Sequence, residues 1–506
     1  MKKRGALNMK NHKIVIIIIS FVLILSLLSS CNNTDEIIGT NSDSTISQTD
    51  SIIDSNSTTD SDSTTDSNST TESDSTTDQI DNTNYDNSTF VLADLENYYG
   101  DIFGGGDVID INVSITEENW QDILKDPTAE EFHTADVTFN GITLQNVAFR
   151  TKGNSSLSDV AKSTSDRYGF KIKTDKYVDD QTINGLNEFV LNACYADSSY
   201  LREYLTYEAM YELGGIVPNV AYCNFYINGE LFGFYLCVES YDDSFIDRIT
   251  DDKDACLYKA DGENCTLLTS DDASGFDIQE GDDDTFANIK NLITVLNSTT
   301  KNNKATLESI LDVNSVLKAI AVNYVMGNYD SYSGSKAHNY YLLYSDGVFE
   351  YIGWDYNMAF GGFPEDGGKS ETLDISSPYL STTAAQRPLF SKLLAIDEYY
   401  DIYVGYVKEL SEYYDDFENV ILPKVQYIQS YVANDPTAFY TISQFTSSVT
   451  STGVIKTSLS TITQSAAVIL LPPGGMGGGG GQTSSTSISI VSYMNTKLTT
   501  IAKMLK

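Results

Sequence analysis

Residues 327–362 read GNYDSYSGSKAHNYYLLYSDGVFEYIGWDYNMAFGG, a stretch that joins a helix pattern to a strand pattern. The apolar spacing in 312–326 predicts a helix before it, and residues 338–355 predict a short β region. Asp330 stands where the helix passes into a loop, and Asp355 ends the last strand and opens a glycine-rich segment. The stretch therefore places two carboxylates at the ends of two successive elements.

The surroundings of Asp355 distinguish it from an ordinary loop aspartate. It lies between Trp354 and Tyr356, directly after the apolar run 349–352. A carboxylate at such a place is expected to be partly buried, and buried charges are paired or coordinate a cation. Mg²⁺ binds through one or two carboxylates together with substrate phosphates. The alternative is that Asp330 and Asp355 are two solvated loop residues.

The patterns outward from this stretch predict an α+β fold, with a strand-rich first half and a helix-rich second half. The folded part, from residue 89 onward, is longer than a single hydrophobic core usually supports. We therefore expect two lobes, residues 89–240 and 241–506, with a cleft between them. The predicted strands and hairpins are 107–115, a hairpin turning at Asn140-Gly141, 168–175, and a hairpin turning at Asn228-Gly229. The predicted helices are a short one after Thr116, then 198–213, 284–298, 312–326, 388–412 and a last amphipathic helix after the glycine-rich loop 472–481.

Two clusters in the first half could contact phosphate. RTKGNSS, residues 150–156, follows a predicted strand, and its small residues would let backbone amides approach an anion. The same sequence also fits a simple turn, and it lacks the GxxxxGK[ST] pattern of a Walker A loop. In the strand 168–175, alternation puts Lys171 and Lys173 on one face. Lysines on an edge strand are normally solvated charges, and the alternative is that one of these two binds phosphate.

Charge excludes whole classes of function. The 506 residues carry a formal charge of −40, of which residues 89–506 hold −32. Nucleic-acid-binding surfaces are basic, so no nucleic-acid partner is expected. An acidic body instead attracts basic protein partners.

The first residues are typical of a targeting segment. Residues 1–31 have a basic start, an apolar run and the ending LSSC, which resembles a bacterial lipobox with Cys31 as the lipidated residue. An uncleaved membrane anchor is the alternative, and both place the protein outside the cytoplasmic membrane and tethered to it. Residues 32–88 repeat Ser, Thr and Asp with almost nothing to bury, which predicts a disordered tether.

Five further cysteines follow Cys31, and they form no CxxC. Five is an odd number, so at least one is unpaired within the monomer. Cys256 and Cys265 could close a local loop.

Over roughly residues 105–505 the chain resembles the CotH family, named for spore coat protein H and classed as atypical secreted protein kinases. The resemblance rests on motifs in the family's order: RTKGNSS, the strand with Lys173, DSSYLREYL, YINGELFGFYLCVE, GNYDSY, HNYYLLY and GWDYNMAFGG. It implies a two-lobed kinase-like fold. It also implies transfer of the ATP γ-phosphoryl group, with Mg²⁺ or Mn²⁺, to Ser or Thr of extracytoplasmic proteins, and a basic substrate suits the acidic body.

The resemblance also implies roles for single residues. Asp330 would be the catalytic aspartate that orients the attacking hydroxyl or accepts its proton. Asp355 would hold the metal, with Asn339 as a further oxygen ligand. Lys173 would contact the phosphates, held by Glu203 or Glu208. The remaining assignments are a loop over the phosphates that includes Arg150, Gly153, Asn154 and Ser155, a hinge near adenine at Glu239, and phosphate or structural pairing by Arg202.

One position departs from the family pattern. Many relatives have W-D-x-D, whereas this chain has Asn357 after Asp355. Asn357 can offer a carbonyl oxygen to a metal but lowers the negative charge of the site. The competing interpretations are a surface binding or adhesion protein and a structural coat component, each on an inactive kinase-like fold. An adhesin has no need for the pair Asp330 and Asp355.

Overall fold

The computed structural model describes residues 98–455 and 489–506, which belong to one compact unit. Within these residues, seven strands close into a barrel in the order β1-β2-β3-β4-β5-β7-β6. Neighbouring strands are antiparallel except β1 and β6, which run parallel. The strands are β1 (Ile109–Ser114), β2 (His133–Phe139), β3 (Ile142–Lys152), β4 (Gly169–Lys173), β5 (Glu188–Asn192), β6 (Val220–Ile227) and β7 (Glu230–Glu239).

Local signals in the sequence determine several barrel connections. Asn140 and Gly141 both have positive φ, at 43° and 87°, as a two-residue turn between β2 and β3 requires. Asn228 and Gly229 do the same between β6 and β7. The helix α2 (Glu117–Lys125) begins after Thr116, whose side chain accepts a hydrogen bond from the Asn119 amide. The predicted hairpins and this N-cap are therefore confirmed.

The barrel has a core of its own. Its interior is filled by alternating residues of the strands, most of them aromatic or β-branched, and many are completely buried. Phe149 stacks on Phe170 with ring centroids 5.0 Å apart, and Phe170 lies 5.4 Å from Phe225. The interior is a packed core formed by strands that lie far apart in sequence.

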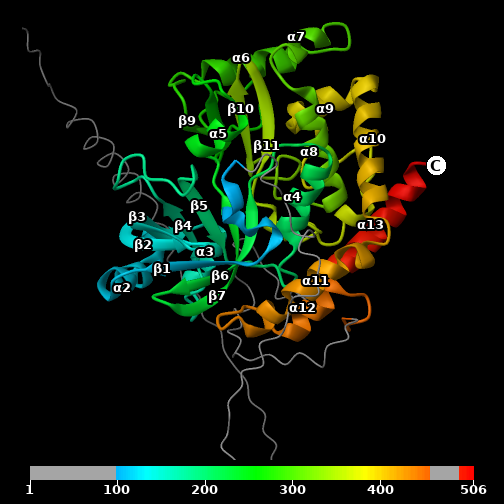
Figure 1. Cartoon of the computed structure of the whole chain (residues 1–506). Coiled ribbons are helices and arrows are strands. Elements are labelled where there is room, and N and C mark those ends of the chain that lie inside the picture. Colours follow the sequence, from blue (N-terminus) through cyan, green and yellow to red (C-terminus); the bar gives the residue numbers. More distant parts are fainter. Residues whose placement is uncertain (1–97, 456–488) are drawn as a thin grey trace, which may run out of the picture. The chain divides into compact units, whose positions relative to one another are not determined.

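The second half combines a sheet with helices. Four strands pair in the order β11-β10-β8-β9: β8 (Cys256–Ala260), β9 (Phe276–Glu280), β10 (Tyr340–Ser345) and β11 (Val348–Gly353). In Figure 1 these strands lie between the barrel and the later helices. Besides α2, one helix of eight or more residues lies between barrel strands, α4 (Arg202–Glu212), which connects β5 to β6. Those that follow β7 are α6 (Ala287–Ser298), α8 (Val313–Met326), α10 (Asp397–Tyr413), α11 (Phe417–Asn434), α12 (Ile442–Val449) and α13 (Ile490–Met504). The shorter ones are α3 (Ser155–Ala161), α5 (Asp243–Ile249), α7 (Lys304–Glu308) and α9 (Pro388–Leu394).

Two expectations for this half need correction. The expected helix 388–412 is two helices, α9 and α10, separated at Ala395 and Ile396. The backbone of Ile396 is extended, with φ −104° and ψ 113°, and this breaks the helical path. The strands β8 and β9 lie in a region where the sequence predicted mainly helices.

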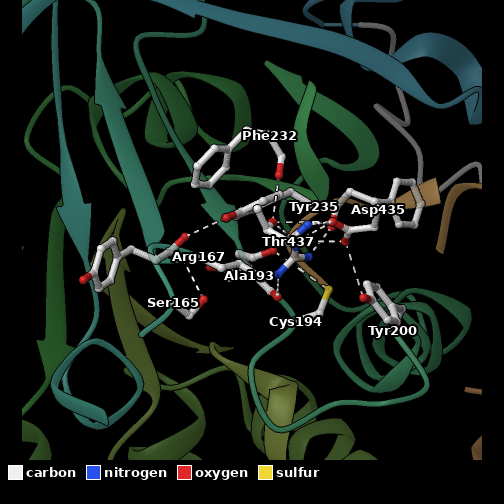
Figure 2. A network of polar contacts seen from close by, with 12 residues as sticks. Ser165, Arg167, Ala193, Cys194, Tyr200, Phe232, Tyr235, Asp435 and Thr437 are labelled. Carbon is white, nitrogen blue, oxygen red and sulfur yellow. Dashed lines mark hydrogen bonds and ion pairs between the residues drawn. The ribbon is translucent and has the colours of Figure 1, made fainter. Parts of the chain in front are cut away.

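A buried ion pair joins the barrel to the helical half (Figure 2). Arg167, just before β4, lies 2.8 Å from Asp435, which directly follows α11, and both side chains are completely buried. The guanidinium also donates to the carbonyls of Ala193 and Phe234 and to the Thr437 hydroxyl. It lies 4.5 Å from the ring centroid of Tyr235. Because the charge is paired and hydrogen-bonded on several sides, this contact fixes the end of α11 against the barrel.

The α+β composition is confirmed, whereas the division into two lobes at residue 240 stays a prediction. All five cysteines of the described ranges are free, so Cys256 and Cys265 form no disulfide. The chain from Cys256 to Ala260 is the extended strand β8, and this extension separates the sulfur of Cys256 from that of Cys265.

Some sequence predictions lie outside the described residues. These are the leader and Cys31, the tether 32–88 and the glycine-rich loop 472–481. Within the described ranges, no helix combines the length and the apolar character that crossing a membrane requires.

Candidate active site

Asp355 lies just past the end of β11, in a backbone conformation that is uncommon for aspartate. Its φ is 56° and its ψ is 64°, in the left-handed region, and it precedes the short 3-10 helix η4 (Tyr356–Met358). Burial raises the pKa of the Asp355 carboxyl, and Asp330 raises it further, while the charge of Lys152 opposes the rise. Among the described residues we find no hydrogen-bond donor to this carboxylate. A half-buried carboxylate of this kind is suited to bind a cation.

Lys152, rather than Lys173, is the lysine whose charge acts most strongly on Asp355. It is the last residue of β3, and its ammonium donates a 2.8 Å hydrogen bond to Oδ1 of Asn192 at the end of β5. The Asn192 amide nitrogen in turn donates to both carboxylate oxygens of Glu203 on α4, at 3.0 and 2.9 Å. Burial lowers the pKa of Lys152, and the negative charges of Asp355 and Glu203 counteract this effect.

Glu203 is the carboxylate of α4 that faces this site. Burial, with a further contribution from Asp355, raises the pKa of Glu203 to about 8. Glu208, the other candidate on α4, instead pairs with Lys424 of α11 at 2.8 Å. Of the two glutamates named from the sequence, the structure thus brings Glu203 to the site and places Glu208 in a separate buried pair.

Asp330 follows α8 and is held by the segment that precedes β10. One carboxylate oxygen lies 2.6 Å from Nε2 of His338, and the Asp330 backbone carbonyl accepts a 2.8 Å hydrogen bond from the Asn339 side chain. The Asn339 carbonyl then accepts from the Trp354 amide at 3.0 Å, which ties this loop to the end of β11. The structure therefore brings together the loops of Asp330, Asn339 and Asp355, the residues for which the family resemblance implies catalytic and metal-binding roles.

Asn357 lies in η4, two residues after Asp355, and is half-buried. No group of three or more His, Cys, Asp or Glu side chains in the described ranges is close enough to form a metal cluster. In the described ranges a metal ion would therefore find at most two such side chains close together at this site, and its other ligands would be amide oxygens, substrate or water. That set suits a hard cation that keeps several of its ligands from substrate or water.

The loop after β3 contains the other expected phosphate contacts. Gly153 has a φ of 130°, and a Cβ there would lie 3.0 Å from the Ser156 hydroxyl, so the turn into α3 favours glycine. Asn154 and Ser155 are exposed beside it. Arg150 does not take part in this loop. Its guanidinium pairs with Glu130 and lies 4.9 Å from the ring centroid of Phe132.

Lys173 and Lys171 do share one face of β4, as the alternation predicts. Glu188 of the neighbouring strand β5 forms ion pairs with both lysines, at 2.5 Å from Lys171 and 4.0 Å from Lys173. Lys173 also lies 3.6 Å from Asp175. The structure thus gives Lys173 two acidic neighbours of its own, and the charge of Lys152 acts on Asp355 in its place.

Arg202 and Glu239 make structural contacts in this state of the protein. Arg202 pairs with Asp197 at 3.4 Å and donates to the carbonyls of Ala359 and Phe360, so it fastens α4 to the segment after Asp355. Glu239 is completely buried. Its carboxylate accepts hydrogen bonds from Arg248, Tyr99 and Asn219. Of the two assignments considered for Arg202, the contacts show structural pairing.

A family model described as CotH kinase protein matches residues 149–463, more than half of the chain. The chain belongs to the CotH kinase family. The matched range includes every residue of the site described above. CotH membership therefore agrees with the family that the motifs indicate.

A curated relative and a solved structure were compared with this CotH chain. The inner spore coat protein H of Bacillus subtilis (strain 168) is 28% identical over 192 residues, which are 36% of this chain and 52% of the relative. The chain thus matches about half the length of that relative. The HipA, HipB and operator DNA complex of Shewanella oneidensis MR-1 is 12% identical, with 79% of this chain and 74% of that chain covered and a TM-score of 0.29. At that score the likeness supports no conclusion.

Three residues of the site were not among the sequence predictions: Lys152, Asn192 and His338. Lys152 lies inside the quoted RTKGNSS motif, directly before Gly153. His338 lies directly before Asn339, which was predicted. A search for charged or amide residues at strand ends would have found Lys152 and Asn192, since both are the last residues of their strands.

Proposed function

We propose that this protein is an atypical protein kinase that transfers the γ-phosphoryl group of ATP to Ser or Thr hydroxyls of extracytoplasmic proteins. The observation that carries the proposal is the convergence of Lys152, Asp330 and Asp355 from three distant segments. The charges of Lys152 and of Asp330 both act on the half-buried carboxylate of Asp355. Binding or adhesion alone would not require an aspartate kept without a hydrogen-bond donor.

The residues present fit a Mg²⁺–nucleotide. Asp355 would hold the metal ion, with amide oxygens of Asn339 and Asn357 as further ligands. When bound, the ion would neutralise charge on the phosphates. Lys152 would contact the phosphates from the barrel side, and the loop Gly153–Ser155 would lie beside them. Lysine binds phosphate as a point charge, which suits this placement.

Asp330 would act on the acceptor hydroxyl. The hydroxyl oxygen attacks the γ-phosphorus, the bond from that phosphorus to the bridging oxygen of ADP breaks, and the hydroxyl proton passes to the Asp330 carboxylate. His338, 2.6 Å from one Asp330 oxygen, orients the carboxylate so that its other oxygen faces the hydroxyl.

The proposed location follows from the N-terminal sequence. A lipid on Cys31 and the tether 32–88 would hold the kinase domain outside the membrane that it is anchored to. The name of the relative, an inner spore coat protein, supports a surface or coat location. Surface or coat proteins rich in Ser and Thr would then be the substrates.

A transfer assay with the full chain tests the proposal. The protein is incubated with γ-labelled ATP, Mg²⁺ or Mn²⁺ and a basic Ser-rich protein. We expect label in the substrate, and a loss of about 10²–10⁴-fold for Asp330→Ala, the range typical of a missing acid–base group. Asp401→Ala, at an exposed position of α10, is the matched control with full activity. A folded protein that transfers no label with either metal would instead support the binding or adhesion alternative.

A further inference from the structure

Lys152 and Glu203 face each other without a direct ion pair. The described residues instead show one amide between them: Asn192 accepts from Lys152 at 2.8 Å and donates to Glu203 at 2.9 and 3.0 Å. Only one orientation of the Asn192 amide satisfies both neighbours, because an ammonium can only donate and a carboxylate can only accept. The hydrogen bonds thus run from Lys152 through Asn192 to Glu203, and each bond fixes the orientation of the side chains that it joins.

The register of the barrel explains how Lys152 reaches a residue two strands away. The strand β4 lies between β3 and β5, and Lys152 pairs with Gly169 at its beginning. A Cβ built on Gly169 would lie 3.5 Å from Cγ of Lys152 and 3.2 Å from the Lys152 carbonyl oxygen. The lysine stem therefore crosses β4 at a position without a side chain. A branched residue at 169 would occupy this path.

We propose that Asn192 is a positioning residue, which aims the Lys152 ammonium at the phosphates of the nucleotide. This inference rests on the proposed function and deepens it. The amide takes one of the three ammonium donors and is itself neutral, so it leaves two donors and the full positive charge for the phosphates. A carboxylate in direct contact would partly neutralise that charge. Gly169 also contributes to this positioning, because it has no side chain to block the Lys152 side chain where that side chain crosses β4.

The test measures ATP–Mg²⁺ affinity of the full chain by calorimetry. We expect Asn192→Leu to weaken binding by at least about tenfold, because Lys152 loses the bond that fixes its direction. Asn224→Leu is the matched control, since Asn224 also forms a side-chain hydrogen bond from a barrel strand, to Asp110, but lies on β6. It should bind as tightly as the unaltered chain.

A double variant separates positioning from a merely structural role. If Asn192 acts through Lys152, Asn192→Leu should cause no further loss of affinity in a Lys152→Met background. Gly169→Val, which leaves Asn192 in place, should weaken binding to a similar extent as Asn192→Leu. Thermal midpoints of all variants show whether each one is folded, and Gly169→Val provides the test if Asn192→Leu does not fold.

Two results would overturn the inference, and they are distinguishable. Unchanged affinity in Asn192→Leu, or losses that simply add in the double variant, would overturn the role of Asn192 and leave the proposed function intact. An unaltered chain that is folded but binds no ATP–Mg²⁺ would overturn the proposed function, and the positioning role with it.

Discussion

Lys152 and Lys173 show why single residues of the site were hard to assign from sequence. The alternation of β4 correctly placed Lys171 and Lys173 on one face, but their acidic neighbour Glu188 comes from the next strand. Which lysine acts on Asp355 depends on where the end of β3 lies relative to the loop after β11. That is a tertiary arrangement of segments about two hundred residues apart, and no local pattern encodes it.

The two lysines make a direct comparison possible. We expect Lys152→Met to weaken ATP–Mg²⁺ binding by about 10–100-fold, the value of one or two hydrogen bonds to a charged group. Lys173→Met should change affinity by less than about twofold, because it removes partly exposed ion pairs with Asp175 and Glu188. Titration calorimetry of both variants measures this. A larger loss of affinity in Lys173→Met than in Lys152→Met would show that Lys173, rather than Lys152, contacts the phosphates.

At the scale of elements, the sequence predicted most of what local chemistry determines. The two Asn-Gly turns and the Thr116 cap occur where predicted. The strands β8 and β9 were missed because they are short, five residues each, and are separated by a loop without a helix or strand. Closure of the barrel was also missed, since the parallel pairing of β1 with β6 joins residues more than a hundred positions apart.

The strand β7 offers a test of the contact between barrel and helices. A Cβ on Gly233 would lie 2.5 Å from Nη1 of Arg167, 2.8 Å from the Thr437 hydroxyl and 3.0 Å from Oδ1 of Asp435. We expect Gly233→Ala to lower the free energy of unfolding by about 1–3 kcal/mol, because these buried groups must shift. Asp435→Asn should cost about 3–5 kcal/mol, since it leaves the Arg167 charge unpaired.

Chemical denaturation checks both values. The control is Gly405→Ala in α10, where nothing lies within 4 Å of the added Cβ and the change should be neutral or slightly stabilising. If Gly233→Ala unfolds at the same denaturant concentration as the unaltered chain, the network in Figure 2 is not the rigid joint that we describe.

The helix α13 packs against the end of α8, which leads into the Asp330 loop. Tyr493 is completely buried, contacts Phe360 edge-to-face at 6.0 Å, and lies so close to Gly327, at the end of α8, that a Cβ there would clash with it. We expect Tyr493→Ala to cost about 3–5 kcal/mol of unfolding free energy, as for other large aromatic truncations. Tyr493→Phe should cost less than about 1 kcal/mol, since among the described residues this hydroxyl makes no hydrogen bond of normal geometry. Equal losses in the two variants would show that the hydroxyl, rather than the ring, supports the loop.

At the scale of the whole molecule, charge is the dominant property. The chain carries −40, and most of it lies outside the first 88 residues. The electrostatic field of such a negative charge raises the association rate with positively charged partners and lowers it with negatively charged ones. The composition therefore constrains the substrate class more than any single motif does.

The charge predicts a substrate preference that depends on salt. Basic Ser/Thr-rich proteins should be phosphorylated faster than acidic ones at about 0.01 M salt, where the Debye length is ~30 Å. The ratio of rates should shrink toward about 0.15 M, where that length is ~8 Å. Initial rates on a matched basic and acidic pair measure it. Equal rates at low salt would contradict electrostatic selection.

The most direct measurement for the whole account is calorimetry of ATP with Mg²⁺ binding to the full chain and to Asp355→Asn. Asparagine tolerates the left-handed backbone of this position, so the variant removes the charge and keeps the shape. We predict that the unaltered chain binds ATP only with the metal and that Asp355→Asn loses at least about 100-fold in affinity. Asp330→Ala should bind nearly as tightly as the unaltered chain, while its phosphate transfer is about 10²–10⁴-fold slower. Metal-dependent ATP affinity that is unchanged in Asp355→Asn would contradict the assignment of this site.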